Sequence, residues 1–348
     1  MTDAFRPDRT RALRAGVIGC GFFAQNHLNA WSGIADVDLV AVCDRDAEKA
    51  DAAARRFGAT AFTDAAEILE TGELDFVDVI TTVESHRPLV EMAAKAGAGV
   101  ICQKPFAETL DDARAMVAAC EAAGVPLMVH ENFRWQKGLR DLGQIVAGGS
   151  IGTPFRAHIE FGHRWPVYDG QPYLRTVDRL AIMDVGLHLF DVARFLLGEV
   201  TSVHCRTQRI NPDVAGEDVF TASLGHASGA VSVNTCSFFS RRDPDPFPQV
   251  LVTVEGDAGT VELLTDYRLR HHAADGTRET QAEASPAPWM EAPWHVVQDS
   301  VRAIQQHWVD TLREGGEPRP SGADNLRTLE VAMAAYESAA KDAVVKLG

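Results

Sequence analysis

Two short segments of the sequence combine residue types that can move a proton. In the first, residues 100–105, an apolar run leads into Lys104 and Pro105. In the second, Asp184 and His188 lie four positions apart, so on a helix both would project from one face. An imidazole with a pKa of about 6.5 exchanges protons near neutral pH, and a carboxylate beside it stabilises the charged form. The pattern indicates acid–base chemistry by Lys104, Asp184 and His188.

Each of these segments also has a plain structural interpretation. Lys104 could be a surface lysine where a strand ends. Asp184 could be a helix N-cap, and His188 could be a core histidine with satisfied ring nitrogens. The functional interpretation gains weight from position, because ligands of open parallel sheets bind at the carboxyl ends of strands, where Lys104 is expected.

A glycine-rich turn near the amino end indicates a dinucleotide site. Residues 15–24 run from an apolar strand into a Gly-x-Gly-x-x-Ala turn. Gly19 permits the tight turn, Gly21 leaves room for the phosphates, and Ala24 lets the helix pack against the strand. The following helix would direct its unsatisfied N–H groups at the anion. The cofactor-binding candidates of this turn are Gly19, Gly21, Phe22 and Phe23.

A second strand, residues 37–43, ends at Asp44, which is 20 positions after Ala24. A ribose-binding acid is expected at about this distance. The Asp44 carboxylate favours the free 2′-hydroxyl of NAD, whereas Arg45 could pair with the 2′-phosphate of NADP. NAD is therefore the expected cofactor, and NADP stays open. The alternative is a glycine-rich connector in which Asp44 caps a helix over 46–57.

The elements that must position these residues change character along the chain. In the first 130 residues strands alternate with alanine-rich helices, which predicts a doubly wound parallel α/β sheet of the Rossmann type. The expected strands are 15–19, 37–43, 75–81, 98–102 and 126–130, and the expected helices are 22–33, 46–57, 64–71, 86–96 and 109–123. We expect this dinucleotide-binding domain to cover residues 1–131.

After about residue 150 short strands and turns dominate, with one early helix near 184–197. This predicts an α+β domain over 132–348, with an open, mostly antiparallel sheet that has helices on one face. Residues 276–290 are expected to form an exposed loop, and two helices, 294–314 and 322–341, to close the chain. The domain would bind substrate and mediate oligomerisation, because the open face of its sheet needs covering by a second copy in a homodimer or homotetramer.

Composition excludes several classes of protein. The 348 residues carry a net charge of −16 and no basic run, which argues against nucleic-acid binding. No apolar stretch is long enough for a membrane span and no signal-peptide core is present. Six scattered cysteines indicate reduced thiols in a cytoplasmic enzyme. No metal-binding motif or nucleophile elbow is found, so no metal is expected.

Together these motifs resemble the glucose–fructose oxidoreductase / inositol dehydrogenase / rhizopine-catabolism (Gfo/Idh/MocA) superfamily of NAD(P)-dependent sugar oxidoreductases. The resemblance spans nearly the whole chain. The motifs that carry it are the Gly19–Ala24 turn, the Thr81-Thr82…His86 loop, Lys104-Pro105, Asp184…His188, Pro320-Ser321-Gly322 and Tyr336-Glu337-Ser338-Ala339. It implies that Lys104 lies by the nicotinamide and the substrate hydroxyl and that Asp184 and His188 act with it. Gln103 replaces the usual glutamate, so the lysine lacks an adjacent carboxylate.

The resemblance also implies roles for residues elsewhere in the chain. Thr81, His86 and Gln103 join the cofactor-binding candidates, and Asn132 would contact the nicotinamide ribose. Arg134 would line the active site, although a structural salt bridge is an equal alternative. Trp165 and Tyr168 are substrate-pocket candidates, because aromatic rings stack on the C–H faces of sugars, or they pack under a long loop. Residues 103–106 and 130–135 faintly resemble the D-apiose dehydrogenase branch.

The function expected from the sequence is NAD-dependent oxidation of a hydroxyl of a small sugar or polyol. His188 would be the general base, Lys104 would stabilise the developing alkoxide and relay protons, and Asp184 would hold the sugar hydroxyl and the histidine. Lys104 as the base is an open alternative. Two other functions stay open: a redox-neutral lyase or glycosidase that retains its NAD, and a non-catalytic NAD(P)-sensing protein.

Overall fold

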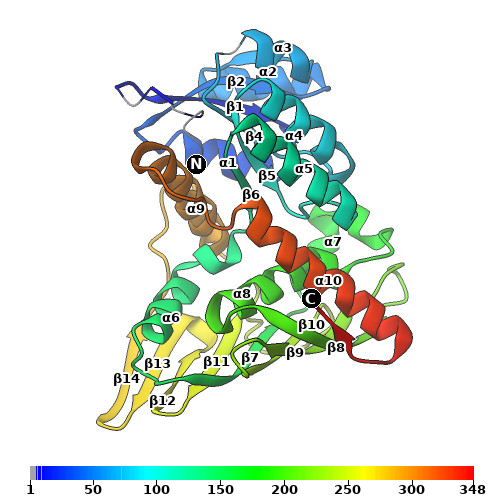
Figure 1. Ribbon diagram of the computed structural model, residues 1–348, viewed down its shortest axis with the longest axis vertical. Helices are drawn as coiled ribbons and strands as arrows, with labels where there is room; N and C mark the ends of the chain where they lie inside the picture. The colour runs from blue at the N-terminus through cyan, green and yellow to red at the C-terminus, as the bar shows by residue number, and fades with distance from the viewer. Residues whose placement is uncertain (1–4, 6, 9, 72) are drawn as a thin grey trace. The chain divides into compact units, whose positions relative to one another are not determined.

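The computed structural model describes residues 5, 7–8, 10–71 and 73–348, which form two compact units (Figure 1). The first unit consists of the described residues up to Glu131 together with Val301–Arg327. The second consists of Asn132–Ser300 and Thr328–Gly348. Of the three boundaries between the units, one follows Glu131, and the other two fall within helices α9 (His295–Glu314) and α10 (Gly322–Lys341).

The described part of the first unit contains a sheet of six parallel strands in the order β3-β2-β1-β4-β5-β6. This confirms the predicted Rossmann sheet and adds β3, a three-residue strand too short to give a periodic signal. The strands are β1 (Leu13–Ile18), β2 (Val37–Cys43), β3 (Thr60–Phe62), β4 (Phe76–Val79), β5 (Gly99–Gln103) and β6 (Leu127–His130). The chain order reverses between β1 and β4, and ligands of such sheets bind outside the carboxyl ends of the strands at this point.

The helices of the first unit begin and end where local chemistry favours it. The Asp46 side chain accepts the backbone N–H groups of Glu48 and Lys49 and so caps α2, while Thr109 caps α5. Both helices end at glycines, Gly58 and Gly124, whose φ values of 74° and 69° are left-handed. The helices are α1 (Ala24–Trp31), α2 (Ala47–Phe57), α3 (Ala65–Thr71), α4 (His86–Lys95) and α5 (Leu110–Ala123), with a 3₁₀ turn η1 (Val83–Ser85).

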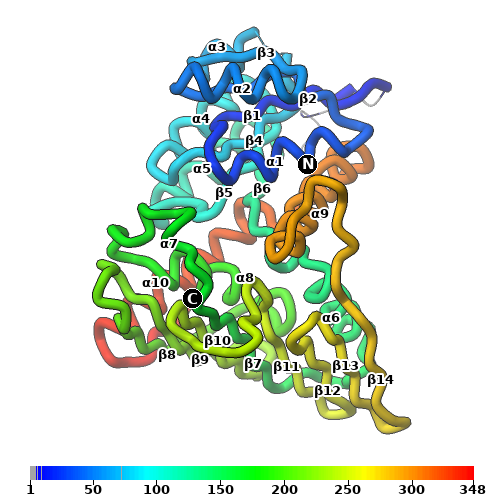
Figure 2. The backbone as a smooth tube through the Cα atoms, turned by 180° about the vertical axis from the view of Figure 1, so that it is seen from behind, coloured from blue at the N-terminus to red at the C-terminus, as the bar shows by residue number. Residues whose placement is uncertain are grey.

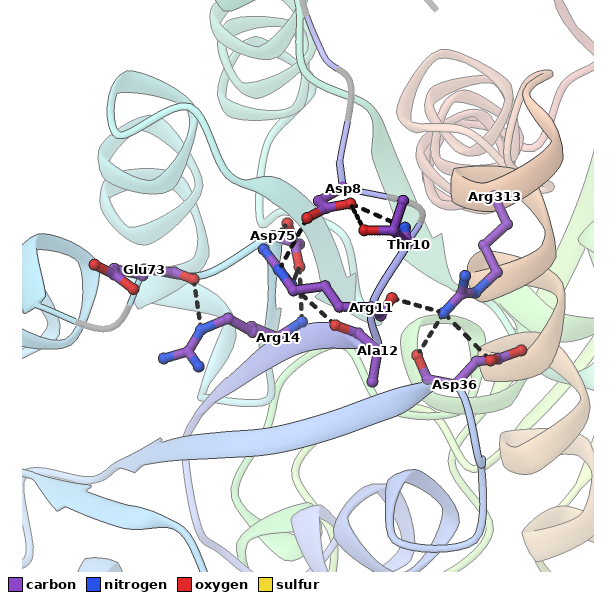
Figure 3. A network of polar contacts seen from close by, with 9 residues as sticks. All are labelled: Asp8, Thr10, Arg11, Ala12, Arg14, Asp36, Glu73, Asp75 and Arg313. Atoms are coloured by element: carbon purple, nitrogen blue, oxygen red, sulfur yellow. Dashed lines mark hydrogen bonds and ion pairs between the residues drawn. The ribbon is translucent and has the colours of Figure 1, made fainter.

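A polar network lies at the amino edge of this sheet, where β1 and β4 begin (Figure 3). The Asp75 carboxylate accepts from both terminal nitrogens of Arg11, at 2.7 and 3.2 Å, and from the backbone N–H of Arg14. Arg313 of α9 donates to the backbone oxygens of Arg11 and Asp36. These contacts tie the starts of β1, β2 and β4 to α9, on the edge opposite to the expected ligand site.

The second unit, all of whose residues are described, contains a nine-stranded mixed sheet that is mostly antiparallel, as predicted. The order is β14-β13-β12-β11-β7-β10-β9-β8-β15, which Figure 2 shows from behind, and only β7 and β10 pair in parallel. The strands are β7 (Pro154–Gly162), β8 (Val200–Gln208), β9 (Val219–His226), β10 (Val231–Ser237), β11 (Leu251–Gly256), β12 (Gly259–Leu263), β13 (Arg268–Ala273), β14 (Gly276–Gln281) and β15 (Val345–Lys346). Helices α6 (Lys137–Ala147) and α8 (Leu187–Leu197) contact the sheet (Figure 1).

Short helical turns complete the second unit. They are η2 (Phe133–Trp135), α7 (Val167–Gly170), η3 (Pro172–Arg175), η4 (Ile182–Gly186) and η5 (Thr265–Tyr267). None of the helices in the described ranges combines the length and the apolar character that crossing a bilayer requires.

Two elements of this unit were not anticipated from the sequence. Residues 276–281 were expected to be loop, but they form β14, whose side chains are all exposed and therefore show no apolar alternation. Helix α6 was missed because Gly138 and Gly143 lower its helix propensity. Both glycines suit the packing, since a Cβ would lie 2.9 Å from a Leu263 methyl group or 2.5 Å from the Phe195 ring, and these side chains would have to shift.

Candidate active site

The glycine-rich turn joins β1 to α1 at the carboxyl edge of the parallel sheet. Its two glycines differ in backbone conformation and in the space around them. Gly19 has φ +104°, and a Cβ at this position would lie 2.3 Å from the backbone oxygen of Ile80. Gly21 has no such conflict, because no described heavy atom lies within 4 Å of its Cβ position. The fold therefore requires Gly19, whereas the space at Gly21 suits the close approach of a phosphate.

The start of α1 offers donors to an anion. No described side chain caps this helix, and its first turn carries no acidic residue, so the positive end of its dipole suits an anion. The N–H groups of Gln25 and Asn26 donate to the backbone oxygens of Phe22 and Phe23, which leaves the turn before them to supply the donors. Phe23 occupies the N-cap position with helical dihedral angles. Phe22, next to Gly21, is 65% exposed, which is unusual for a large aromatic side chain and leaves its ring accessible to a ligand.

Asp44 lies directly after β2 and contacts the turn. Its Oδ2 accepts the backbone N–H of Cys20 at 2.8 Å, and its Oδ1 accepts that of Asp46 at 2.9 Å. A carboxylate has about four acceptor sites, so this one retains capacity for a ribose hydroxyl. The cap of α2 is Asp46 and not Asp44, which removes the plain structural interpretation of Asp44. Arg45 is exposed. Open space, helix donors and a carboxylate thus fit a dinucleotide.

The loop after β4 is held by hydrogen bonds within the first unit. The Ser85 hydroxyl donates to Thr81 Oγ1 at 2.7 Å. His86 is 1% exposed, and its two ring nitrogens lie 3.2 Å from the backbone oxygens of Phe106 and Thr81. Burial lowers the pKa of this imidazole from its ordinary 6.5. The ring of His86 therefore lies between the loops that follow β4 and β5, and in its neutral form it donates its one N–H to one of the two carbonyls.

Gln103 and Lys104 lie where β5 ends. The Gln103 side chain is buried, and its Oε1 accepts the backbone N–H of Lys104 at 2.6 Å. Lys104 itself is half-buried. The lysine therefore belongs to the same edge of the sheet as Gly19, Gly21 and Asp44, as the sequence predicted from its position after a strand.

In the second unit Asp184 and His188 do not share one regular α-helix. Asp184 belongs to the π-helical turn η4, and His188 lies in the first turn of α8. Single π turns within helices frequently occur at functional sites. The His188 ring is 3% exposed and stacks in parallel on Phe133, with centroids 3.7 Å apart. The stack fixes the plane of the imidazole.

The charge of Asp184 reaches two ring side chains of the same unit. Burial lowers the pKa of His163 to about 4, and the nearby carboxylates of Asp245 and Asp184 oppose this shift. Burial raises the pKa of the Tyr168 hydroxyl, and the charges of Asp218 and Asp184 raise it further. His163 was not among the predicted site residues. Its only sequence signal was a place in the aromatic segment that contains Trp165 and Tyr168.

Arg134 and Asn132 are occupied by structural contacts within the second unit. Arg134 forms a two-pronged ion pair with the fully buried Asp191 of α8, with Nε 2.6 Å from Oδ2. This is the structural salt bridge that the sequence left as an alternative. The Asn132 amide is 2% exposed and donates to the Ser300 hydroxyl at 2.7 Å.

Trp165 lies on an aromatic cluster. Its ring stacks on Phe247 with centroids 5.3 Å apart and planes 4° from parallel, and 38% of its surface stays exposed. The Phe247 ring also meets Trp294 and His163 edge-on. A supported aromatic ring with one accessible side suits contact with the C–H face of a sugar. Among the described residues no group of three His, Cys, Asp or Glu side chains is arranged to hold a metal ion.

Comparisons with known proteins agree with this geometry. Residues 13–131 match the model of the GFO_IDH_MocA oxidoreductase family with its NAD-binding Rossmann fold, and residues 139–262 match the GFO/IDH/MocA C-terminal domain. The chain is 51% identical to a D-apiose dehydrogenase of Paraburkholderia graminis, over 97% of this chain and 90% of that one. It is 45% identical to a D-apiose dehydrogenase of Rhizobium rhizogenes, over 97% and 98%.

A solved structure is similar over nearly the whole length of the chain. It is the crystal structure of an oxidoreductase from Agrobacterium radiobacter in complex with NAD+, L-tartaric acid and magnesium. The two chains are 45% identical, with a TM-score of 0.94 over 96% of this chain and 98% of that one.

Proposed function

The chain belongs to the Gfo/Idh/MocA oxidoreductase family, and from this premise we propose that its substrate is D-apiose. It is an NAD-dependent sugar dehydrogenase. The main structural support for this activity is that Gly21, Asp44 and Lys104 all lie at the carboxyl edge of the parallel sheet. The choice of D-apiose is supported by the two similar dehydrogenases of that sugar.

NAD binding is assigned to the backbone and side chains of the first unit. The N–H groups that follow Cys20 would hold the diphosphate, beside the open space at Gly21. Asp44 would accept from the adenosine ribose, with Arg45 and Phe22 flanking it and Phe23 beginning the helix. Thr81 and the backbone of Gln103 would line the nicotinamide end, while His86 lies between their loops. Bound NAD supplies the hydride acceptor for the carbon that carries the substrate hydroxyl.

The residues of the chain supply proton transfer and orientation. We assign the general base to His188, which takes the hydroxyl proton as the carbon loses its hydride and the carbonyl forms. Lys104 stabilises the developing negative charge on the oxygen, and Asp184 orients the imidazole and a sugar hydroxyl. Lys104 is the second candidate for the base.

Further residues are proposed to shape the sugar site. Trp165 and Tyr168 would contact the sugar, the former through its exposed ring face. Asn132 would contact the nicotinamide ribose through its backbone, or through its side-chain amide once the hydrogen bond to Ser300 is broken. Arg134 would act as a positioning residue, because its partner Asp191 lies on α8, three positions after His188.

We also propose that the protein works in the cytoplasm as a homodimer or homotetramer. All six cysteines are unpaired and buried, which suits a reducing compartment. Phe155 and Val231, on the neighbouring strands β7 and β10, are 52% and 42% exposed. Light scattering of the purified protein would give its oligomeric state, and fractionation of the native host would locate it.

The test of function is a panel of sugars with each cofactor. Purified protein is mixed with D-apiose, other aldoses or myo-inositol, together with NAD or NADP, and reduced cofactor is followed by absorbance. We expect one NADH per D-apiose consumed, and slower reaction with NADP because Asp44 repels its 2′-phosphate. Sugar consumed without NADH release would favour a redox-neutral reaction. Turnover of other sugars but not D-apiose would overturn the substrate assignment.

A further inference from the structure

A buried hydrogen-bonded chain of side chains ends at the peptide of Lys104. It starts at Asp78 of β4, passes through His27 of α1, and reaches Gln103 of β5. Asp78 and His27 are fully buried and Gln103 is 6% exposed. His27 Nδ1 lies 2.7 Å from Asp78 Oδ2, and Gln103 Nε2 lies 3.0 Å from His27 Nε2. Gln103 Oε1 then accepts the Lys104 N–H at 2.6 Å.

The hydrogen positions in this chain follow from one backbone group. The Lys104 N–H can only donate, so the atom of Gln103 that faces it must be the carbonyl oxygen. The amide NH₂ of Gln103 must then point at His27 Nε2, and this ring nitrogen must accept. A neutral imidazole with Nε2 as acceptor carries its hydrogen on Nδ1, where it donates to Asp78. Every bond in the chain is thus assigned a direction.

The surroundings hold the carboxylate of Asp78 in place. Its Oδ2 also accepts from Trp31 Nε1 at 2.8 Å and from Gln305 Nε2 at 3.5 Å. The other titratable groups nearby are His130, whose ring centroid lies 4.0 Å from that of His27, and Cys102. Burial raises the pKa of the Cys102 thiol well above its ordinary value, so this thiol stays neutral.

The chain explains why residue 103 is glutamine. A glutamate would accept from the Lys104 N–H equally well, but it has no hydrogen to offer His27 Nε2. His27 would then face an acceptor at both ring nitrogens, which only the doubly protonated imidazolium satisfies. An amide at position 103 keeps the buried ring neutral and leaves the negative charge of the chain on Asp78.

We propose that Asp78, His27 and Gln103 are positioning residues that fix the Lys104 peptide and tie it to α1, the helix that follows the glycine-rich turn. The turn that would hold the diphosphate and the lysine are thereby joined by hydrogen bonds inside one unit. Reaction rates depend steeply on such distances, since a shift of about 1 Å can cost on the order of a hundredfold. The catalytic part of the proposal rests on the proposed function of Lys104, whereas the hydrogen-bond directions do not.

The directions are tested by nitrogen-15 NMR of the histidine side chains. The signal of His27 is assigned by its loss in His27→Gln. We expect a neutral ring with hydrogen on Nδ1 in the native protein, and an imidazolium in Gln103→Glu. His226 is the internal control, because its Nδ1 donates to the Gly198 carbonyl and its Nε2 faces Ser232 in the second unit. A native His27 with hydrogen on Nε2 would overturn the assignment, whether or not the protein oxidises D-apiose.

The positioning role is tested by kinetics of three variants. Gln103→Met keeps the side-chain length but loses donor and acceptor, and we expect turnover to fall on the order of tenfold with the Kd for NAD within about threefold. Gln103→Glu keeps the acceptor for Lys104 and should restore most of this turnover. Gln305→Met, a buried control that reaches Asp78 but not Lys104, should lower stability alone. Normal turnover in Gln103→Met, with only reduced stability, would show a purely structural role and overturn the proposal.

Discussion

The two edges of the parallel sheet carry similar residue types and use them in opposite ways. At the amino edge, Asp75 and Arg11 bind each other, and Arg313 binds the backbone oxygen of Arg11 (Figure 3). At the carboxyl edge, the Asp44 carboxylate accepts backbone N–H groups from Cys20 and Asp46, and the space beside Gly21 holds no described atom. Charged residues alone therefore do not mark the site. What marks it is that strand ends and the start of a helix meet there with donors directed outward.

We expect the largest difference between the two edges when one long cationic side chain is removed from each. Lys104→Met should lower turnover about 10²–10⁴-fold, because the group that stabilises the developing charge is lost. Arg11→Met, at the amino edge, should leave turnover unchanged and alter the free energy of unfolding by no more than about 1 kcal/mol, since Arg11 is exposed. Steady-state kinetics and urea unfolding measure both. Equal loss of turnover in the two variants would show that the edges do not differ.

The two glycines of the turn separate folding from binding. In Gly21→Ala the new methyl group meets no described protein atom, so stability should hold while the Kd for NAD rises at least about tenfold, or about 1.4 kcal/mol. In Gly19→Ala the methyl group meets the Ile80 oxygen at a left-handed φ, and we expect a loss of stability of about 1–3 kcal/mol. Calorimetric titration and urea unfolding distinguish the two. Unchanged NAD affinity in Gly21→Ala would remove the diphosphate from this turn.

The same isosteric change can be made to a carboxylate on each edge. Asp75→Asn should lower the free energy of unfolding by about 1–2 kcal/mol, because the partly buried carboxylate receives three donors, while kcat/KM stays the same. Asp44→Asn should instead reduce the preference for NAD over NADP. Denaturant curves and kinetics with each cofactor provide the readouts. A change of cofactor preference in Asp75→Asn would be inconsistent with its place at the amino edge.

The smallest expected effect is a dependence of stability on pH that arises at the carboxyl edge. Burial lowers the pKa of His86 below its ordinary 6.5, so the folded protein keeps this ring neutral. As pH falls below about 6.5, the unfolded chain takes up a proton that the fold does not, and stability decreases. The free energy of unfolding is measured at pH 7.5 and at pH 5, each about one unit or more from 6.5. We expect it to fall less between these two values in His86→Gln than in the native protein. An identical pH dependence in both proteins would exclude His86 as its source.

Predictions from the sequence were correct where a short segment contains the residues that determine its own structure. The Gly19–Ala24 turn, the acid at Asp44 and the position of Lys104 after a strand are local patterns, and they predicted the fold of the first unit. They failed where a contact joins distant segments. Arg134 and Asp191 are 57 positions apart, and Gln103 and His27 are 76 apart. No local pattern of residues reveals such pairs.

Helix α6 and strand β14 show the same limit in secondary structure. Two glycines in α6 oppose a helix locally, and the close approach of Leu263 and Phe195, far along the chain, accounts for them. Strand β14 has no buried side chain and forms through backbone pairing with β13. Both elements depend on contacts with residues elsewhere in the chain, which the apolar periodicity of the segment itself does not reveal.

By itself the sequence determined the class of protein: a dinucleotide-binding turn, alternating strands and helices, and a lysine after a strand end, because backbone conformation and apolar periodicity are encoded over a few residues. Only the tertiary structure decided which polar side chains bind one another. Hydrogen-bond partners such as Asp78, His27 and Gln103 come from three separate elements, and their directions depend on burial away from water, which arises only when the sheet and its helices pack.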